Sequence, residues 1–130
     1  RDLLATLNMG LEDRMKTKMG LLSGGQRQAA SLLMATVAQP KLLLLDEHTA
    51  ALDPGAAEKV MAVTARIVAQ DKITTLMITH DMDYALSVGS RTIMLDSGRI
   101  VMDLSGPERE AMTPGGLSEI FYTKSRRKHL

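Results

Sequence analysis

The sequence predicts an α/β fold in which a sheet that is parallel in its middle is flanked by helices, with a hairpin near the carboxyl end. Two short apolar runs, residues 42–45 and 74–79, are typical of strands that are buried on both faces. Apolar residues recur at helical spacing between these runs, and a strand–helix–strand succession indicates parallel pairing. In a third segment, residues 93–102, two apolar stretches flank a turn at residues 96–99, which indicates a hairpin.

The composition is that of a small folded domain. The 130 residues are 45% hydrophobic and 24% charged, which supplies material for a core and excludes a disordered tail. With 16 basic and 15 acidic residues the formal net charge is +1, which argues against a dedicated nucleic-acid binder. Cysteine is absent, so disulfides and thiolate metal sites are excluded, and no apolar run approaches the ~18 residues that cross a bilayer. The chain begins with Arg1, and we expect it to be part of a longer sequence.

Capping residues and prolines predict where the helices begin and end. An amino-terminal helix with an apolar face is predicted from four leucines at helical spacing: Leu3, Leu4, Leu7 and Leu11. A second helix begins near Ser23, which is a good N-cap, and ends before Pro40. A third begins at Asp53, where an N-cap carboxylate precedes a proline, and Asp81 could cap a short fourth helix.

Three titratable side chains fall at predicted strand ends. Asp46 and Glu47 follow the first strand, and His80 follows the second. Ligands of parallel α/β sheets bind beyond the carboxyl ends of the strands. Two carboxylates there could hold a metal–phosphate complex, since phosphoryl transfer needs a Mg²⁺ holder and a group that orients the attacking water. The alternatives are a solvated strand end for the carboxylates and an ordinary surface histidine.

A serine and two glycines open the second predicted helix, within residues 22–26. A helix start of this kind offers free N–H groups and a partial positive charge, and glycines let a phosphate approach closely. The alternative is an ordinary serine-capped helix. Gly20 and Gly25 imitate the spacing of a phosphate-binding P-loop, but Gln26 stands in place of the required lysine and Arg27 in place of the hydroxyl residue. We therefore reject a P-loop at this place.

The order of these motifs resembles the ATP-binding cassette (ABC) ATPase family, over residues 11–103. Residues 22–26, Leu-Ser-Gly-Gly-Gln, resemble the signature motif of that family. Residues 42–46 resemble its Walker B strand, and residues 51–53 resemble its D-loop. The resemblance implies a partial P-loop NTPase-type parallel sheet with flanking helices, and it implies ATP and Mg²⁺ as ligands.

The resemblance also implies roles for single residues. Asp46 would hold Mg²⁺, Glu47 would polarise the attacking water as the catalytic glutamate, and His80 would contact the γ-phosphate as the switch histidine. In this family two nucleotides are sandwiched between two subunits, and each site is built from both chains. The signature residues would therefore address ATP on a partner subunit, with the D-loop aspartate in the dimer seam: Ser23, Gly24, Gly25, Gln26 and Asp53.

The expected organisation is that of one truncated ABC ATPase domain. Residues 1–38 would end a helical subdomain, residues 39–106 would form the core, and residues 107–130 would be a carboxy-terminal extension in which the pattern fades. Walker A, the aromatic adenine platform and the glutamine loop are missing, so we interpret the chain as a fragment that is inactive alone. The family also has proline where this chain has His48, a change that could tune the neighbouring carboxylate or be neutral.

The resemblance favours an ATP-hydrolysing subunit of a bacterial ABC transporter, with Thr-Ala-Ala-Leu-Asp at residues 49–53 typical of importers. Its expected partners are a second ATPase subunit and membrane permease subunits, with a substrate-binding protein as a further candidate. Its expected location is the cytoplasmic face of the membrane. One alternative is a soluble ABC ATPase that acts on nucleic acid or ribosomes, which only the basic end at residues 124–128 favours. The other alternative is a non-catalytic relic.

Overall fold

The computed structural model describes residues 1–126, which fall into two compact units, one from Arg1 to Ile78 and one that begins at Thr79. The fold is mixed α/β, as predicted, with a parallel and an antiparallel pair of strands in the described residues. The subdomain boundaries that we expect after residues 38 and 106 concern functional parts of the domain. The division at residue 78 separates compact units and does not test them, so they stay predictions. The side chains of the basic end, residues 124–128, lie outside the described part. None of the helices within residues 1–126 is long and apolar enough to cross a membrane.

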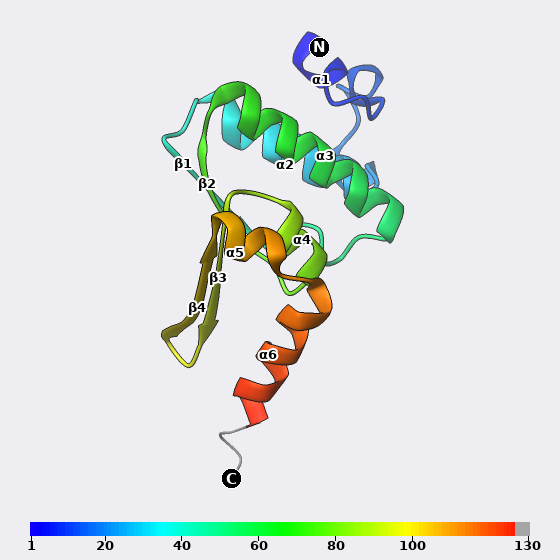
Figure 1. The fold of residues 1–130 in the computed structure, drawn as a ribbon. Helices are drawn as coiled ribbons and strands as arrows, with labels where there is room; N and C mark the ends of the chain where they lie inside the picture. Colours follow the sequence, from blue (N-terminus) through cyan, green and yellow to red (C-terminus); the bar gives the residue numbers. More distant parts are fainter. Residues whose placement is uncertain (127–130) are drawn as a thin grey trace. The chain divides into compact units, whose positions relative to one another are not determined.

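The first unit contains a parallel strand pair and two long helices. Its elements are α1 (Asp2–Ala5), two 3-10 turns η1 (Leu11–Asp13) and η2 (Met19–Leu21), α2 (Gly24–Val37), β1 (Leu42–Asp46), α3 (Pro54–Asp71) and β2 (Thr74–Ile78). Figure 1 shows α2 and α3 running side by side. The predicted amino-terminal helix is shorter than the leucine pattern indicated, because Asn8 and Gly10 adopt left-handed backbone with φ of 53° and 68°. Leu7 and Leu11 nevertheless remain buried in the core.

Local capping chemistry places both long helices where the sequence predicted them. Ser23 is the N-cap of α2, and α2 ends at Val37, before Pro40. Asp53 is the N-cap of α3, and its carboxylate accepts a hydrogen bond from the Ala56 N–H at 3.0 Å. The start of each helix is therefore fixed by a side chain of the residue that precedes it.

The β1–β2 pair is covered by helices on one face only. The strands are parallel, with Leu42 opposite Thr74 and Asp46 opposite Ile78. Leu43 and Leu45 are buried in the core, whereas alternate apolar residues on the other face are more than half exposed: Leu42 53%, Leu44 65%, Leu76 54% and Ile78 52%. The strands are predicted to be buried on both faces in a full domain. In the described residues α2 and α3 bury one face, and the other face leaves exposed the apolar surface that is expected of a chain lacking part of that domain. The second apolar face of the strand pair is suited to packing against a further layer of secondary structure.

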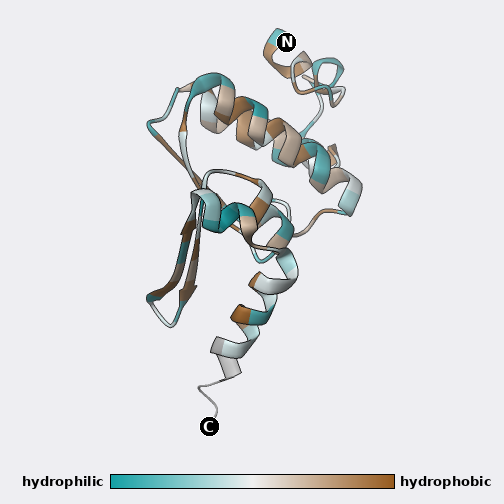
Figure 2. Cartoon of the chain, in the orientation of Figure 1, coloured by the Kyte–Doolittle hydropathy of each residue, from teal (hydrophilic) through white to brown (hydrophobic). Residues whose placement is uncertain are grey.

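The second unit is built around the predicted hairpin. Its elements are α4 (Met82–Ser87), β3 (Arg91–Asp96), β4 (Arg99–Ser105), α5 (Gly106–Ala111) and α6 (Pro114–Arg126). Ser97 and Gly98 form the turn with φ of 50° and 73°, as in the tight hairpin turns that match strand twist. Figure 2 shows apolar residues along both strands of this hairpin. The expected loss of pattern after residue 106 is wrong, because α5 and α6 are regular helices there.

Side chains tie the hairpin to the helices of the second unit. Arg109 of α5 donates to the Thr92 hydroxyl at 2.9 Å and to the Val88 carbonyl at 2.8 Å. Arg91 on β3 donates through Nε and a terminal nitrogen to the carboxylate of Asp103 on β4, at 2.8 Å and 2.5 Å. These contacts join residues that are 12 or more positions apart and hold β3, β4 and α5 as one packed group.

Candidate functional site

The end of β1 is an abrupt turn that carries the two predicted carboxylates. Asp46 is the last residue of β1, and both Asp46 and Glu47 are exposed. Glu47 has a φ of 44°, a left-handed backbone that is uncommon for residues other than glycine. Its N–H donates to the Ile78 carbonyl of β2 at 2.9 Å, and its own carbonyl accepts from the Ala50 N–H at 3.0 Å. The backbone of Glu47 is therefore held from both sides at the carboxyl edge of the parallel pair.

His80 follows β2 by two residues, and it is exposed. The next residue, Asp81, donates its N–H to the Thr79 hydroxyl at 3.0 Å, and its carboxylate caps α4 by accepting from the Tyr84 N–H at 3.0 Å. The predicted cap at Asp81 is confirmed. His80 and Glu47 belong to different compact units, so their approach to one another stays a prediction.

Ser23 and Gln26 form a reciprocal capping box at the start of α2. The Ser23 hydroxyl accepts from the Gln26 N–H at 3.2 Å, and the Gln26 side-chain oxygen accepts from the Ser23 N–H at 3.1 Å. The Gln26 amide nitrogen donates to the Met9 carbonyl at 3.0 Å. The side chain of Gln26 is therefore engaged at both its oxygen and its nitrogen inside the chain. Sequence reasoning assigned this side chain to a ligand and missed the internal contacts.

The two glycines of this segment lie against the start of α3. A methyl group added at Gly24 would come within 2.9 Å of Leu52 Cδ2, and one added at Gly25 would come within 3.3 Å of Ala56 Cβ. Residues 22–26 and residues 51–53, which sequence reasoning selected separately, are thus neighbours in one chain. The close approach gives the glycines a packing role that the sequence alone did not reveal.

A histidine that the sequence left without a clear role has a specific partner. His48 Nε2 lies 3.0 Å from the Thr64 hydroxyl of α3, and Thr64 in turn lies 2.8 Å from the Val60 carbonyl. Burial lowers the pKa of His48 from its ordinary value of 6.5, because the charged form of the ring loses solvation. No signal in the sequence pairs positions 48 and 64, because the contact depends on how the turn folds against α3.

No preformed metal cage is present within residues 1–126, where no group of three or more His, Asp or Glu side chains is placed to hold an ion. A single exposed carboxylate at a strand end nevertheless fits Mg²⁺, which is usually bound by one or two carboxylates together with substrate phosphates and water. Asp46 has that setting, and its role as a ligand stays a prediction.

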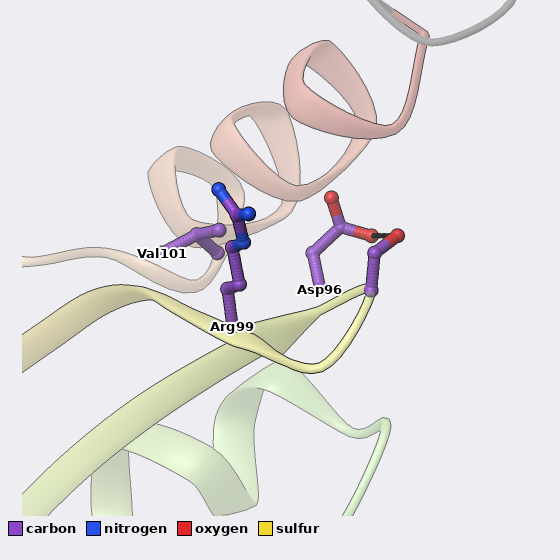
Figure 3. Close-up of a pocket in the computed structure, with 4 residues that line it drawn as sticks. Asp96, Arg99 and Val101 are labelled. Carbon is purple, nitrogen blue, oxygen red and sulfur yellow. Dashed lines mark hydrogen bonds between the residues drawn. The ribbon is translucent and has the colours of Figure 1, made fainter.

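A surface hollow lies elsewhere, beside the hairpin turn of the second unit. It has a volume of about 400 Å³ and is lined by Asp96, Ser97, Arg99 and Val101 (Figure 3). The Ser97 hydroxyl and the Asp96 carboxylate are 3.2 Å apart at its rim. None of the side chains selected from the sequence lines it, so it does not contribute to the candidate site.

Known proteins resemble the chain over most of its length. The family model described as "ABC transporter" matches residues 1–50. A tyrosine transport ATP-binding protein of Clostridioides difficile (strain R20291) is 46% identical over 119 residues, which cover 92% of this chain and 47% of that protein. An aliphatic sulfonates import ATP-binding protein of Pseudomonas putida is 38% identical over 105 residues, which cover 81% of this chain and 39% of that protein.

A solved structure has the same fold. It is described as an inward-facing conformation of a metal-chelate type ABC transporter, and it superposes with a TM-score of 0.72 at 29% identity. The match covers 93% of this chain and 46% of that chain. The chain therefore spans less than half the length of the proteins that it matches here.

Proposed function

The chain belongs to the ABC transporter family of ATPases, and from that premise we propose that it is the carboxy-terminal part of an ATP-hydrolysing subunit of a bacterial ABC importer. The observation that carries the proposal is the end of β1, where Asp46 and Glu47 lie at the carboxyl edge of a parallel strand pair. A relative named for tyrosine transport supports a transporter subunit, and one named for sulfonate import supports the importer class.

At this edge Asp46 would hold Mg²⁺, which would offset the charge of the ATP phosphates, and Glu47 would orient the attacking water. The turn at Glu47 suits that task because its backbone is fixed by hydrogen bonds to Ile78 and Ala50. A fixed base loses little orientational freedom in the transition state, and positioning is a large part of catalysis in phosphoryl transfer. His80 contacts the γ-phosphate from the segment that follows β2.

The start of α2 serves a second subunit. Gly24 and Gly25 occupy the first helical positions, whose N–H groups have no acceptor within the helix, and the Ser23 hydroxyl proton is available after its oxygen has capped Gln26. The N–H groups of Gly24 and Gly25 and the hydroxyl of Ser23 would donate hydrogen bonds to the γ-phosphate of ATP on the partner subunit. Gln26 holds them in place through its bonds to Ser23 and Met9, while Asp53 at the neighbouring helix start lies in the dimer seam.

Residues 1–130 contain no G-x-x-x-x-G-K-[ST] segment to bind the phosphates of their own nucleotide. ATP binding therefore requires the remaining part of the ATPase domain. The exposed apolar face of β1–β2, on which Leu44 is 65% exposed, supports a further layer of the domain that packs on this face. The complete subunit works at the cytoplasmic face of the membrane, under permease subunits and with a substrate-binding protein on the opposite side.

The test uses the complete ATPase that contains this sequence. Glu47→Gln keeps the size of the side chain but removes its basicity, and we expect turnover to fall by about 10²–10⁴-fold while ATP binding survives. Glu58→Gln, at an exposed position on α3, is the matched control and should leave turnover unchanged. Near-normal turnover of Glu47→Gln would refute the assigned base.

The same variant tests the two-subunit site. With hydrolysis blocked, we expect ATP to drive Glu47→Gln into a dimer that size-exclusion chromatography resolves. Ser23→Arg in that background should abolish the dimer, because a bulky side chain fills the space beside Gly24 and Gly25. An inactive Glu47→Gln variant that stays monomeric with ATP would overturn the shared nucleotide site.

A further inference from the structure

His48 ties the turn that follows β1 to the middle of α3. Its Nε2 atom lies 3.0 Å from the hydroxyl oxygen of Thr64, a residue that is only 2% exposed. The imidazole itself is half-buried, so its contact with Thr64 is partly shielded from water. A hydrogen bond in such surroundings competes less with solvent than one at the surface does.

The direction of this hydrogen bond follows from the second contact of Thr64. The Thr64 hydroxyl oxygen lies 2.8 Å from the Val60 carbonyl oxygen, an acceptor that has no proton to give. The single hydroxyl proton must therefore lie between these two oxygens, and the Thr64 oxygen accepts from His48. In the neutral ring the proton is consequently on Nε2, and Nδ1 carries none. The two contacts select one tautomer.

Glu47, the residue before His48, has a strained backbone that such an anchor can stabilise. Its φ of 44° lies in the left-handed region, which is strained for residues other than glycine and persists where the surroundings fix it. One side of the turn is held by the Glu47 N–H on the Ile78 carbonyl. The other side continues directly into His48, whose ring is held by Thr64.

We propose that His48 is a positioning residue for Glu47: its Nε2–H···Thr64 hydrogen bond anchors the turn to α3 and so fixes where the carboxylate stands. The inference rests on the proposed function, in which Glu47 orients the attacking water. A small displacement of such a base is enough to slow the chemical step on the order of tenfold to a hundredfold. Loss of the anchor therefore lowers kcat and leaves ATP affinity, which other residues supply, unchanged.

The hydrogen bond between His48 and Thr64 can be tested by nuclear magnetic resonance of the complete ATPase with ¹⁵N-labelled histidine. We expect neutral His48 to carry its proton on Nε2, and Thr64→Val to convert this single form into a mixture of tautomers. Thr64→Ser retains a hydroxyl at the same place and should keep the Nε2–H form. A wild-type His48 that carries its proton on Nδ1 would overturn the inference without reference to catalysis.

The positioning role of His48 can be tested by steady-state kinetics of the same protein. We expect Thr64→Val and His48→Phe each to lower kcat by about tenfold or more, with KM for ATP within about twofold of wild type. The double variant should lose no more than the worse single variant, because both remove one bond. Thr64→Ser, which retains the hydroxyl, should keep kcat close to that of the wild type.

Thr36→Val is the matched control. Thr36 is 3% exposed, and its hydroxyl bonds to the Leu32 carbonyl one turn earlier in α2, as that of Thr64 does in α3, but it has no histidine partner among the described residues. Thr36→Val should lower the melting temperature as Thr64→Val does while kcat of the folded enzyme stays unchanged. Equal kcat in the two valine variants would overturn the positioning role. Normal turnover of Glu47→Gln would instead refute the proposed function, and the Nε2–H signal would still report the bond.

Discussion

A charge placed on the exposed face of β1–β2 should be tolerated by this chain, whereas the same charge one residue away should destabilise it strongly. Leu44 is 65% exposed, and its neighbour Leu43 is 5% exposed on the opposite face. We expect Leu44→Glu to change the free energy of unfolding by less than about 1 kcal/mol. Leu43→Glu places an unpaired carboxylate in the core, and we expect a loss of about 3–5 kcal/mol.

The exposed face also sets the tendency of residues 1–130 to associate. Complete burial of a Leu or Ile side chain contributes about 1.5–3 kcal/mol, and roughly half of that remains for each of the four exposed side chains of this face. Covering them all would therefore contribute about 3–6 kcal/mol before the entropy of association is subtracted. We expect the parent chain to form oligomers and the double variant Leu44→Glu/Leu76→Glu to shift toward the monomer.

Urea unfolding followed by circular dichroism measures the stability of each variant, and size-exclusion chromatography with light scattering measures association. Equal destabilisation by Leu44→Glu and Leu43→Glu would contradict an exposed face, since the face would then already be covered. Association of the doubly charged variant as strong as that of the parent chain would contradict a role of this face in oligomer formation.

Three further predictions concern ligand binding, capping and acid stability. Residues 1–130 alone should give no isotherm with Mg-ATP at micromolar ligand, and a clear micromolar isotherm in titration calorimetry would contradict the need for a separate phosphate loop. Ser23→Ala should lower the free energy of unfolding by about 1 kcal/mol because it removes the cap of α2, whereas Ser31→Ala, at an exposed position inside the helix, should be neutral or slightly stabilising by the same measurement. The Arg91 hydrogen bond lowers the pKa of Asp103 from 3.8, so the folded chain releases this proton more readily than the unfolded one. The contribution of this pair to the free energy of unfolding is present above pH 3.8 and is lost as the pH falls through the lower folded pKa. Asp103→Asn should therefore flatten this part of the acid-unfolding profile. An unchanged profile would show that the pair does not stabilise the fold.

The parts of the fold that the sequence predicted correctly are those determined by neighbouring residues. Ser23 and Asp53 cap their helices through bonds to residues three positions away, and such short-range signals are visible in the sequence. The hairpin turn at Ser97 and Gly98 is equally local. The amino-terminal helix was predicted too long because the apolar pattern continued across Asn8 and Gly10, while the backbone did not.

What the sequence could not reveal depends on contacts between distant residues. The apolar residues of β1 indicated burial on both faces, but the pattern cannot say which residues supply the covering layer. The bond between His48 and Thr64 spans 16 positions, and the Gln26 contact with Met9 spans 17. Helix α6 was missed because Gly115 and Gly116 weaken helix propensity, while the 1% exposed Leu117 anchors the helix by packing that no local signal records.

The contact between the two helix starts restricts how this protein can evolve. A methyl group at Gly24 would displace the end of the Leu52 side chain, and one at Gly25 would press on Ala56 Cβ. A larger side chain at position 24 is therefore accommodated best by a smaller one at position 52, and the same relation links positions 25 and 56. Related sequences should change these positions in pairs rather than singly. A swap that restores the lost space should rescue a variant that either substitution alone impairs.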